Sequence, residues 1–197
     1  MPLTAATVTV PLSVPPPAFV PMVSVMLLES VLTLFNGRAH LLGVESQTRF
    51  AEGCRLYGSQ GELRQVFVNL IGNALDAMLY GGRLMVRTCA HKGERRGVRA
   101  TIADTGEGMS QETMARLFRP FFTTKRRGGT GLGLSTVLGI VKGHGGFVTV
   151  SSEAGHGTAF KIYLPATGAP EFVLGKAELA APSGHNELIL LVDDEAP

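Results

Sequence analysis

Apolar residues recur along the chain with two different spacings, and these spacings predict its secondary structure. Residues 62–79 have the strongest helical pattern, with an apolar stripe made of Leu63, Val66, Phe67, Leu70, Ile71, Ala74 and Leu75. Weaker helical patterns are found at residues 23–35, 111–117 and 132–142. Strand-like runs are found at residues 83–90, 97–103, 147–152, 158–164 and 187–192, and a short extended stretch is predicted at 48–57.

These elements predict an α/β fold. Most of the strands come in pairs joined by short turns, so neighbouring strands are expected to be antiparallel. Such pairs, interleaved with helices, predict a two-layer α/β sandwich with a mixed, mostly antiparallel sheet and helices on a single face. A doubly wound parallel sheet is not expected, because the regular alternation of strand and helix is missing.

The pattern also divides the chain into four segments. Residues 1–22 are a proline-rich lead, 23–165 the main domain, 166–186 a linker rich in Ala, Pro and Gly, and 187–197 the start of a further domain. The lead has no charged residue, but its prolines argue against a membrane-spanning helix and its start lacks the basic residues of a signal peptide. We therefore expect a flexible lead and no direct membrane contact by the main domain.

Charge and cysteine content exclude several classes of function. The net charge of +2 is too small to predict binding to nucleic acid or to an acidic membrane surface. Cys54 and Cys89 are far apart and lack the spacing of a metal site, so no disulfide scaffold is expected. We expect a cytoplasmic location for this domain, although its parent protein can be anchored in a membrane.

Two asparagines on the long helix are candidate metal ligands. Asn69 and Asn73 are four residues apart, which places both amides on one face about one turn from each other. Amide oxygens suit a hard cation such as Mg²⁺, which usually also binds waters and substrate phosphates. The alternative is that both asparagines only decorate an exposed helix face.

An acidic turn follows the strand at residues 97–103. Asp104 opens the run Asp-Thr-Gly-Glu-Gly-Met, in which Gly106 and Gly108 allow the backbone to approach a flat base closely. A carboxylate there can accept a hydrogen bond from the amino group of adenine, whereas guanine presents an oxygen at that position. Alone, the run is also compatible with an ordinary turn.

A glycine-rich loop and an aromatic segment complete the set of motifs. Residues 128–134 read GGTGLGL and lead into a helix, so their backbone amides and the helix N-terminus can bind phosphates. The loop lacks the Lys-Ser/Thr of a P-loop, and the alternative is a mobile loop without a ligand. In the segment 118–125, FRPFFTTK, at least one aromatic residue is expected in the core, and Lys125 could reach a phosphate.

In order and spacing, these segments resemble the N-box, glycine boxes and F-box of sensor histidine kinases. The matching text is RQVFVNLIGNALDAM, DTGEGM, FRPFFTTK, GTGLGLSTVLGIVKGHGG and GHGTAFKIYLP, within residues 23–165. The family implies the Bergerat ATP-binding fold, in agreement with the predicted sandwich. The resemblance also implies ATP and Mg²⁺ as cofactors and phosphoryl transfer to a histidine as the reaction.

The resemblance implies roles for individual residues. Asn73 would be the principal Mg²⁺ ligand, assisted by Asn69, and both would be catalytic together with Lys125. Asp104 would bind the adenine amino group, supported by Thr158. The implied ATP site as a whole consists of Asn73, Asp76, Asp104, Gly106, Gly108, Met109, Phe118, Thr124, Lys125, Gly129, Thr130, Gly131, Leu132, Gly133, Leu134 and Thr158.

For Asp76, a place near the pocket mouth is considered, but a solvated surface role is favoured. In related ATP hydrolases of the gyrase and chaperone type, a glutamate that activates water stands where Asn69 stands here. Its absence argues against hydrolysis. Sensor kinases carry their phosphoacceptor in a dimerisation domain whose signature follows a histidine, and none of the five histidines here has that neighbourhood. His40, upstream of the N-box, is predicted to lie in a turn.

The expected partners are therefore a separate dimerisation or histidine phosphotransfer domain and a response-regulator receiver. Residues 187–197 resemble the first strand and acidic pair of such a receiver, which suggests a hybrid kinase; a charged tail is the alternative. Two other functions remain open. The domain could be a catalytically silent ATP-binding regulatory module, or a serine kinase like the anti-sigma factors of the same fold.

Overall fold

A computed structural model describes residues 6–7, 22–23, 26–51, 56–92, 96–125 and 129–165. Most of the lead, the linker 166–186, the expected receiver start at 187–197, Cys54 and Gly128 lie outside the described residues. The described helices are α1 (Met26–Leu41), α2 (Gln60–Asp76), α3 (Gln111–Arg116) and α4 (Gly133–Gly143). The described strands are β1 (Ala6–Thr7), β2 (Met22–Val23), β3 (Val44–Arg49), β4 (Leu56–Tyr57), β5 (Gly82–Lys92), β6 (Arg96–Asp104), β7 (Phe147–Glu153) and β8 (Gly157–Pro165).

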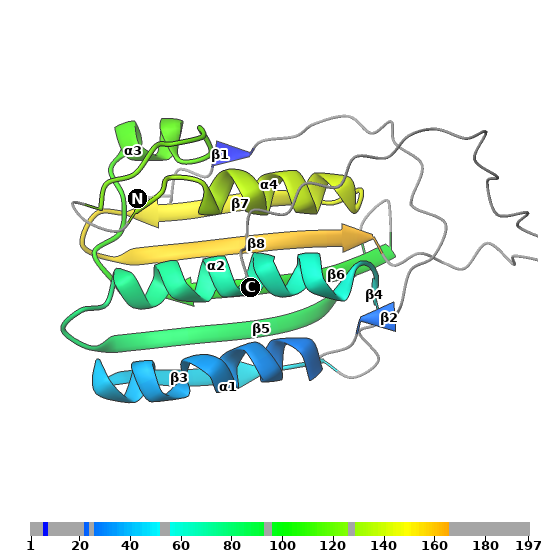
Figure 1. Ribbon diagram of the computed structural model, residues 1–197, viewed down its shortest axis with the longest axis horizontal. Coiled ribbons are helices and arrows are strands. Elements are labelled where there is room, and N and C mark those ends of the chain that lie inside the picture. The colour runs from blue at the N-terminus through cyan, green and yellow to red at the C-terminus, as the bar shows by residue number, and fades with distance from the viewer. Residues whose placement is uncertain are drawn as a thin grey trace, which may run out of the picture.

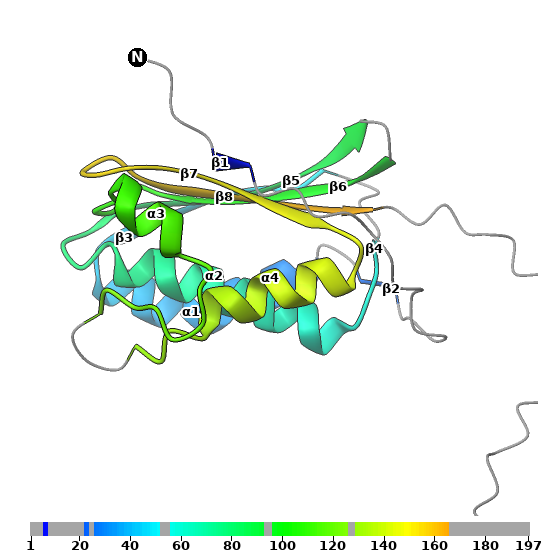
Figure 2. The same ribbon diagram turned by 90° about the horizontal axis from the view of Figure 1, so that it is seen from above.

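The predicted two-layer sandwich is confirmed. Within the described ranges, one sheet has six strands in the order β1-β7-β8-β6-β5-β3, and β2 pairs with β4 separately. All neighbours in the large sheet are antiparallel except β3 and β5, which makes the sheet mixed. Helices α1, α2 and α4 cover one face, and the other face carries no helix among the described elements (Figures 1 and 2).

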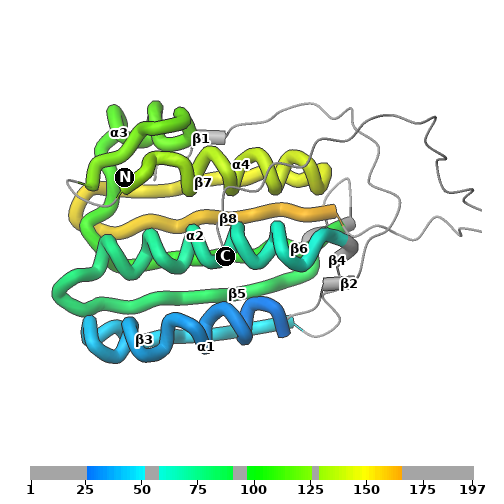
Figure 3. The backbone as a smooth tube through the Cα atoms, in the orientation of Figure 1, coloured from blue at the N-terminus to red at the C-terminus, as the bar shows by residue number. Residues whose placement is uncertain are grey.

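The core lies between the sheet and these helices. Helix α2 lies over the middle of the sheet, roughly along its strands (Figure 3), and buries the seven residues of the predicted stripe. The strand predicted at 158–164 lies in β8, where buried residues alternate and Phe160, Ile162 and Leu164 are directed into the core. Ser59 caps the start of α2 by accepting a hydrogen bond from the Glu62 amide, and Ser110 caps α3 in the same way by accepting from the Thr113 amide.

The two largest boundary differences from the sequence prediction have a physical reason. Helix α1 continues to Leu41, because residues 36–41 bury only Ala39 and so show no apolar stripe; His40 therefore lies in the last helical turn rather than in a loop. Strand β3 begins at Val44 and is exposed after that first residue, because it is an edge strand. Its polar sequence lacks the alternation that would reveal a strand.

The N-terminal lead contributes a short strand, β1, and a second one, β2, lies at its end. Ala6–Thr7 pairs with β7 at the sheet edge, and Met22–Val23 pairs with Leu56–Tyr57. The helices of the described ranges are too short or too polar to cross a bilayer.

Candidate functional site

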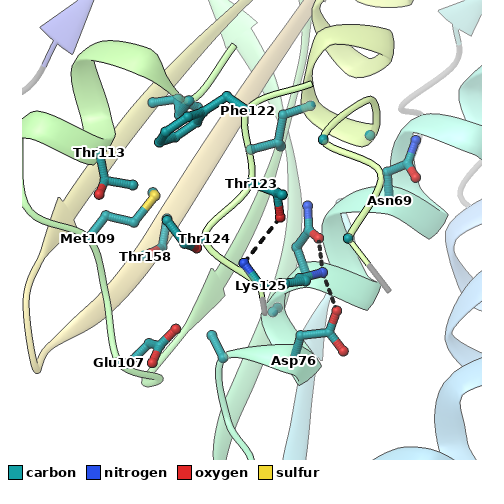
Figure 4. A pocket seen from close by; sticks show the side chains of 18 of the residues that line it. Asn69, Asp76, Glu107, Met109, Thr113, Phe122, Thr123, Thr124, Lys125 and Thr158 are labelled. Atoms are coloured by element: carbon teal, nitrogen blue, oxygen red, sulfur yellow. Dashed lines mark hydrogen bonds and ion pairs between the residues drawn. The ribbon is translucent and has the colours of Figure 1, made fainter. Parts of the chain in front are cut away.

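A cavity of about 480 Å³ opens between α2, the start of α4 and the loops that follow β6 and α3 (Figure 4). Most of the predicted site residues line it. These are Asn69, Asn73, Asp76, Asp104, Gly108, Met109, Thr124, Lys125, Gly129, Thr130, Gly131, Gly133, Leu134 and Thr158. Glu107, Met109 and Thr158 lie at the opposite end of the cavity from Asn69 (Figure 4), so the cavity has two chemically different ends.

Asp104 is a buried carboxylate with one oxygen left for a ligand. It ends β6, and its Oδ1 accepts hydrogen bonds from the backbone amides of Gly106 at 2.9 Å and Thr158 at 3.2 Å. Among the described residues, nothing donates a hydrogen bond to Oδ2. Burial raises the pKa of Asp104 above its ordinary value of 3.8, although the two amides act in the opposite direction. This end of the cavity therefore offers a buried hydrogen-bond acceptor.

Ser152 links the strands beside Asp104, and no motif in the sequence indicated this role. Its hydroxyl lies 2.9 Å from the Thr158 hydroxyl, accepts a hydrogen bond from the Met109 amide at 2.9 Å and donates to the Gly157 carbonyl. Ser152 and Thr158 are directly opposed in the β7–β8 pairing. The serine thus fixes both the Thr158 side chain and the backbone of the loop that carries Met109.

Two glycines let three backbone segments meet at this end. A side chain at Gly108, whose φ is +64°, would place its Cβ 1.9 Å from the Glu153 carbonyl oxygen. A side chain at Gly106 would strike the Ala77 carbonyl oxygen at 2.5 Å, so this residue packs behind the cavity wall and does not line it. Both positions require glycine because the neighbouring atoms belong to the backbone.

The other end of the cavity contains amide oxygens and a lysine. The Lys125 ammonium donates to Asn73 Oδ1 at 2.9 Å and forms an ion pair with Asp76. Arg38 of α1 pairs with the other oxygen of Asp76. Asp76 is thus held between two cations at the cavity wall. Its position in the sequence favoured a solvated surface role, and the structure corrects that prediction.

The charges around Asp76 determine its ionisation. Burial alone would raise the pKa of Asp76, but the hydrogen bonds and charges of Lys125 and Arg38 outweigh it and hold the pKa below its ordinary value. The side chains of the three residues are partly exposed, at 30% for Asp76. The carboxylate is therefore ionised at neutral pH, and both cations remain attracted to it.

The glycine-rich loop lies beside the aromatic segment and Asn69. A Cβ at Gly131, whose φ is +67°, would lie 2.3 Å from the Phe121 backbone, and a Cβ at Gly133 would lie 3.4 Å from Asn69 Oδ1. The first turn of α4 therefore lies next to Asn69. Phe118 packs against the core and Leu132 precedes α4, and neither lines the cavity.

Several lining residues were not singled out from the sequence. They are Ala74, Ala77, Glu107, Ser110, Thr113, Leu117, Phe122, Thr123 and Phe160. Most of them lie within or between the motifs already quoted, so their place in these motifs could have marked them as candidates for the site. Which side chain of a motif faces the cavity depends on tertiary packing.

The donor set fits a hard cation better than a soft one. The described residues contain no group of three His, Cys, Asp or Glu side chains that could hold a metal. The oxygens available at the Lys125 end belong to Asn69, Asn73 and Asp76, and Asn73 Oδ1 already binds a cationic group. Mg²⁺ sites typically have only a few oxygen ligands from the protein, and phosphates and water complete the coordination.

Comparison with curated proteins identifies relatives of this chain. Sporulation kinase C of Bacillus subtilis is 38% identical over 141 residues, which is 71% of this chain and 32% of that protein. Sensor kinase CckA of Brucella abortus is 39% identical over 181 residues, which covers 80% of this chain and 19% of that protein. The chain thus spans a third or less of the length of these relatives.

Solved structures agree with the fold. The catalytic domain of histidine kinase ThkA superposes with a TM-score of 0.65 at 25% identity, covering 75% of this chain and 95% of that one. Full-length ShkA, solved in complex with AMPPNP, gives a TM-score of 0.65 at 32% identity, covering 75% of this chain and 32% of that one.

A family model described as histidine kinase-, DNA gyrase B-, and HSP90-like ATPase matches residues 58–168. Because that match spans more than half of the chain, the chain belongs to this ATPase family and carries the ATP-binding catalytic domain of histidine kinases.

Proposed function

We propose that this domain transfers the γ-phosphoryl group of ATP to a histidine of a dimerisation domain. The observation that carries the proposal is a single cavity with a free carboxylate oxygen at one end and paired amide oxygens at the other. These two ends suit the two ends of Mg²⁺-ATP.

At the base end, Asp104 would accept a hydrogen bond from the adenine amino group through Oδ2. Its Oδ1 is already engaged by the Gly106 and Thr158 amides, which fixes the direction of the free oxygen. Guanine would present an oxygen to this carboxylate, and two acceptors repel each other. The buried site would therefore select adenine.

At the phosphate end, Asn73 and Asn69 would hold Mg²⁺ and Lys125 would contact a phosphate oxygen. Bound Mg²⁺ would neutralise charge on the phosphates, which is the main catalytic requirement of phosphoryl transfer. The first turn of α4 and the loop at Gly129, Thr130 and Gly131 would supply backbone amides to the phosphates. These residues position the γ-phosphoryl group and leave its acceptor to another domain.

The acceptor would be the imidazole of a histidine, which is a competent nucleophile when it is neutral. The domain then needs no strong base of its own. The position that aligns with the catalytic glutamate of related hydrolases is Asn69, whose amide cannot take a proton from water. This supports transfer to a protein acceptor rather than hydrolysis.

We further propose a hybrid kinase, with a receiver as the next partner, acting in the cytoplasm. Two features of the sequence support this. A linker-like segment precedes the apolar run 187–192, and the acidic pair Asp193 and Asp194 follows it. Among the structural relatives, histidine kinase ThkA has been solved in complex with response regulator protein TrrA, which shows that pairing for that protein.

The first prediction tests binding and transfer together. With Mg²⁺, the purified chain should bind an ATP analogue and should label a separately supplied dimerisation domain from γ-labelled ATP. Replacing Asn73 by Ala should lower the transfer rate by at least about a hundredfold, since it removes an oxygen from a preorganised charge-stabilising site. Asn36→Ala, on the exposed face of α1, is the matched control and should transfer normally.

The chemistry of the product separates the alternatives. Phosphohistidine is labile in acid, so loss of the label in acid supports the histidine kinase. An acid-stable label would instead indicate a serine kinase. Tight nucleotide binding with no labelled product would indicate a silent regulatory module, and absence of nucleotide binding would contradict all three functions.

A further inference from the structure

Lys125 occupies an unexpected position for a residue that should contact a phosphate. Its ammonium donates a hydrogen bond to Asn73 Oδ1 at 2.9 Å (Figure 4). This is the oxygen assigned above to the metal. The Lys125 amide also donates to Thr123 Oγ1 at 3.1 Å, which fixes the backbone on that side. A cation is therefore already present at the oxygen where a divalent ion would bind.

Asp76 holds that ammonium in place. One of its oxygens pairs with Lys125 and the other with Arg38, which belongs to α1. Asp76 is also the last residue of α2, where the exposed carbonyl groups of the helix end add partial negative charge. Lys125 is thus bound at a site with net attraction for cations, and Arg38 fixes the orientation of the carboxylate.

An ammonium and a divalent ion cannot share the same amide oxygen. Both would lie within about 3 Å of it, and charges of the same sign at such separations repel strongly when they are partly shielded from water. Binding of the metal at Asn73 therefore requires Lys125 to leave that oxygen. Asp76, still held by Arg38, would keep the released ammonium at the cavity wall, where phosphates arrive.

We propose that Lys125 is an internal stand-in for the metal: it occupies the cation position at Asn73 until a divalent ion arrives with the nucleotide, and Arg38 positions it through Asp76. This inference rests on the proposed function. It adds to that function a coupling between metal and nucleotide, and it assigns Arg38 as a positioning residue. In the absence of metal, Lys125 supplies part of the missing positive charge, so nucleotide binding depends less on Mg²⁺ than it otherwise would.

The coupling can be measured without any phosphoryl transfer. The affinity for a fluorescent ATP analogue is determined once with saturating Mg²⁺ and once with EDTA, and the ratio of the two affinities is the coupling factor. In Lys125→Met, affinity in EDTA should fall more than affinity in Mg²⁺, so the coupling factor should rise roughly tenfold, as expected for loss of one charged contact. Lys142→Met, an exposed lysine of α4, is the matched control and should leave both affinities unchanged.

A simple phosphate contact predicts a different result. If Lys125 only contacts a phosphate regardless of the metal, both affinities fall equally and the coupling factor stays constant, which overturns the proposal. If the unmodified protein binds the analogue in neither condition, the proposed function itself fails. Thermal unfolding of Lys125→Met, whose side chain is 40% exposed, verifies that the variant is folded.

The role of Arg38 is tested by a double-mutant cycle. Arg38→Ala should raise the coupling factor roughly threefold, the effect expected of one partly exposed ion pair, and Arg38→Lys should restore most of the original value. In the Lys125→Met background, Arg38→Ala should have no further effect on the coupling factor. Equal effects of Arg38→Ala in both backgrounds would show that Arg38 does not act through Lys125 and would overturn this part of the proposal.

Discussion

At the scale of single residues, Asp104 shows a conflict between stability and binding. Its carboxylate is buried, and burial raises its pKa in the folded state despite two backbone hydrogen bonds. A group with a raised pKa stabilises the fold fully only below its unfolded pKa, here about 3.8, and this contribution is lost as pH rises through the folded pKa. At neutral pH, the ionised carboxylate therefore lowers the free energy of unfolding of the nucleotide-free protein.

The Asp104→Asn variant should separate these two effects. Its amide oxygen can still accept from Gly106 and Thr158, so the free energy of unfolding at pH 7 should equal or exceed that of the unmodified protein. The difference between the two proteins should shrink as pH falls toward 4, which urea denaturation at several pH values will measure. Asp76 also makes the stability depend on pH, because its pKa is lowered and its contribution is lost as pH falls. This contribution is the same in both proteins, so it cancels when their free energies of unfolding are subtracted.

Binding should change in the opposite direction. In the variant, an amide nitrogen instead of Oδ2 would face the adenine amino group, which places two donors together. Affinity for an ATP analogue should fall by at least about tenfold, the effect of leaving a buried donor unsatisfied. Calorimetric titration will measure it. Unchanged affinity would mean that Asp104 does not contact the base.

At the scale of elements, His144 joins the end of α4 to the start of α2. Its Nδ1 lies 2.9 Å from the Ile140 carbonyl oxygen, and its Nε2 accepts a hydrogen bond from the Ser59 amide at 3.1 Å. Glu62 Oε2 lies 3.7 Å from the same nitrogen. The ring thus links the end of α4 to the residue that caps α2.

Replacing His144 by Ala should loosen this junction without removing a residue that lines the cavity. Both hydrogen bonds disappear, and the Ser59 amide loses its partner, so the free energy of unfolding should fall by about 1–3 kcal/mol. Urea denaturation will measure the change. His156→Ala, at a side chain that is 73% exposed, is the matched control and should stay within about 0.5 kcal/mol of the original. A loss of stability as large as that of His144→Ala in the control would contradict the assignment.

The same elements show what the sequence could predict. The apolar stripe of α2 was predicted residue by residue, because burial against a sheet imposes a regular spacing. Strand β3 was largely missed, because only Val44 of this edge strand is buried. Ser152 and Arg38 reach the site through strand register and helix packing, which bring together residues far apart in sequence. Local patterns contain no information of that kind, whereas the motif residues themselves could be found by their order and spacing.

At the scale of the whole molecule, the cavity belongs to both layers of the sandwich. Asp104, Thr158 and Phe160 come from the sheet, whereas Asn69, Asn73 and Leu134 come from helices α2 and α4. The same strands and helices contribute to a single cluster of buried residues. A ligand in this cavity contacts both layers of one core, so its binding energy should stabilise the described domain as a unit.

Ligand binding should therefore shift the global unfolding of the domain. An ATP analogue with Mg²⁺ at a hundred times its dissociation constant should raise the free energy of unfolding by about 2.7 kcal/mol, because it binds only the folded state. For a domain of this size, the midpoint temperature should rise by roughly 5–10 °C, and the transition should remain single. Differential scanning calorimetry will measure both quantities, with Asp104→Asn as the control that should show at most about half of this shift at the same analogue concentration, because a tenfold weaker affinity lowers the stabilisation to about 1.4 kcal/mol. A shift confined to one of two separate transitions would show that the cavity lies in a part that unfolds independently, and it would contradict the view that one core supports both ends of the site.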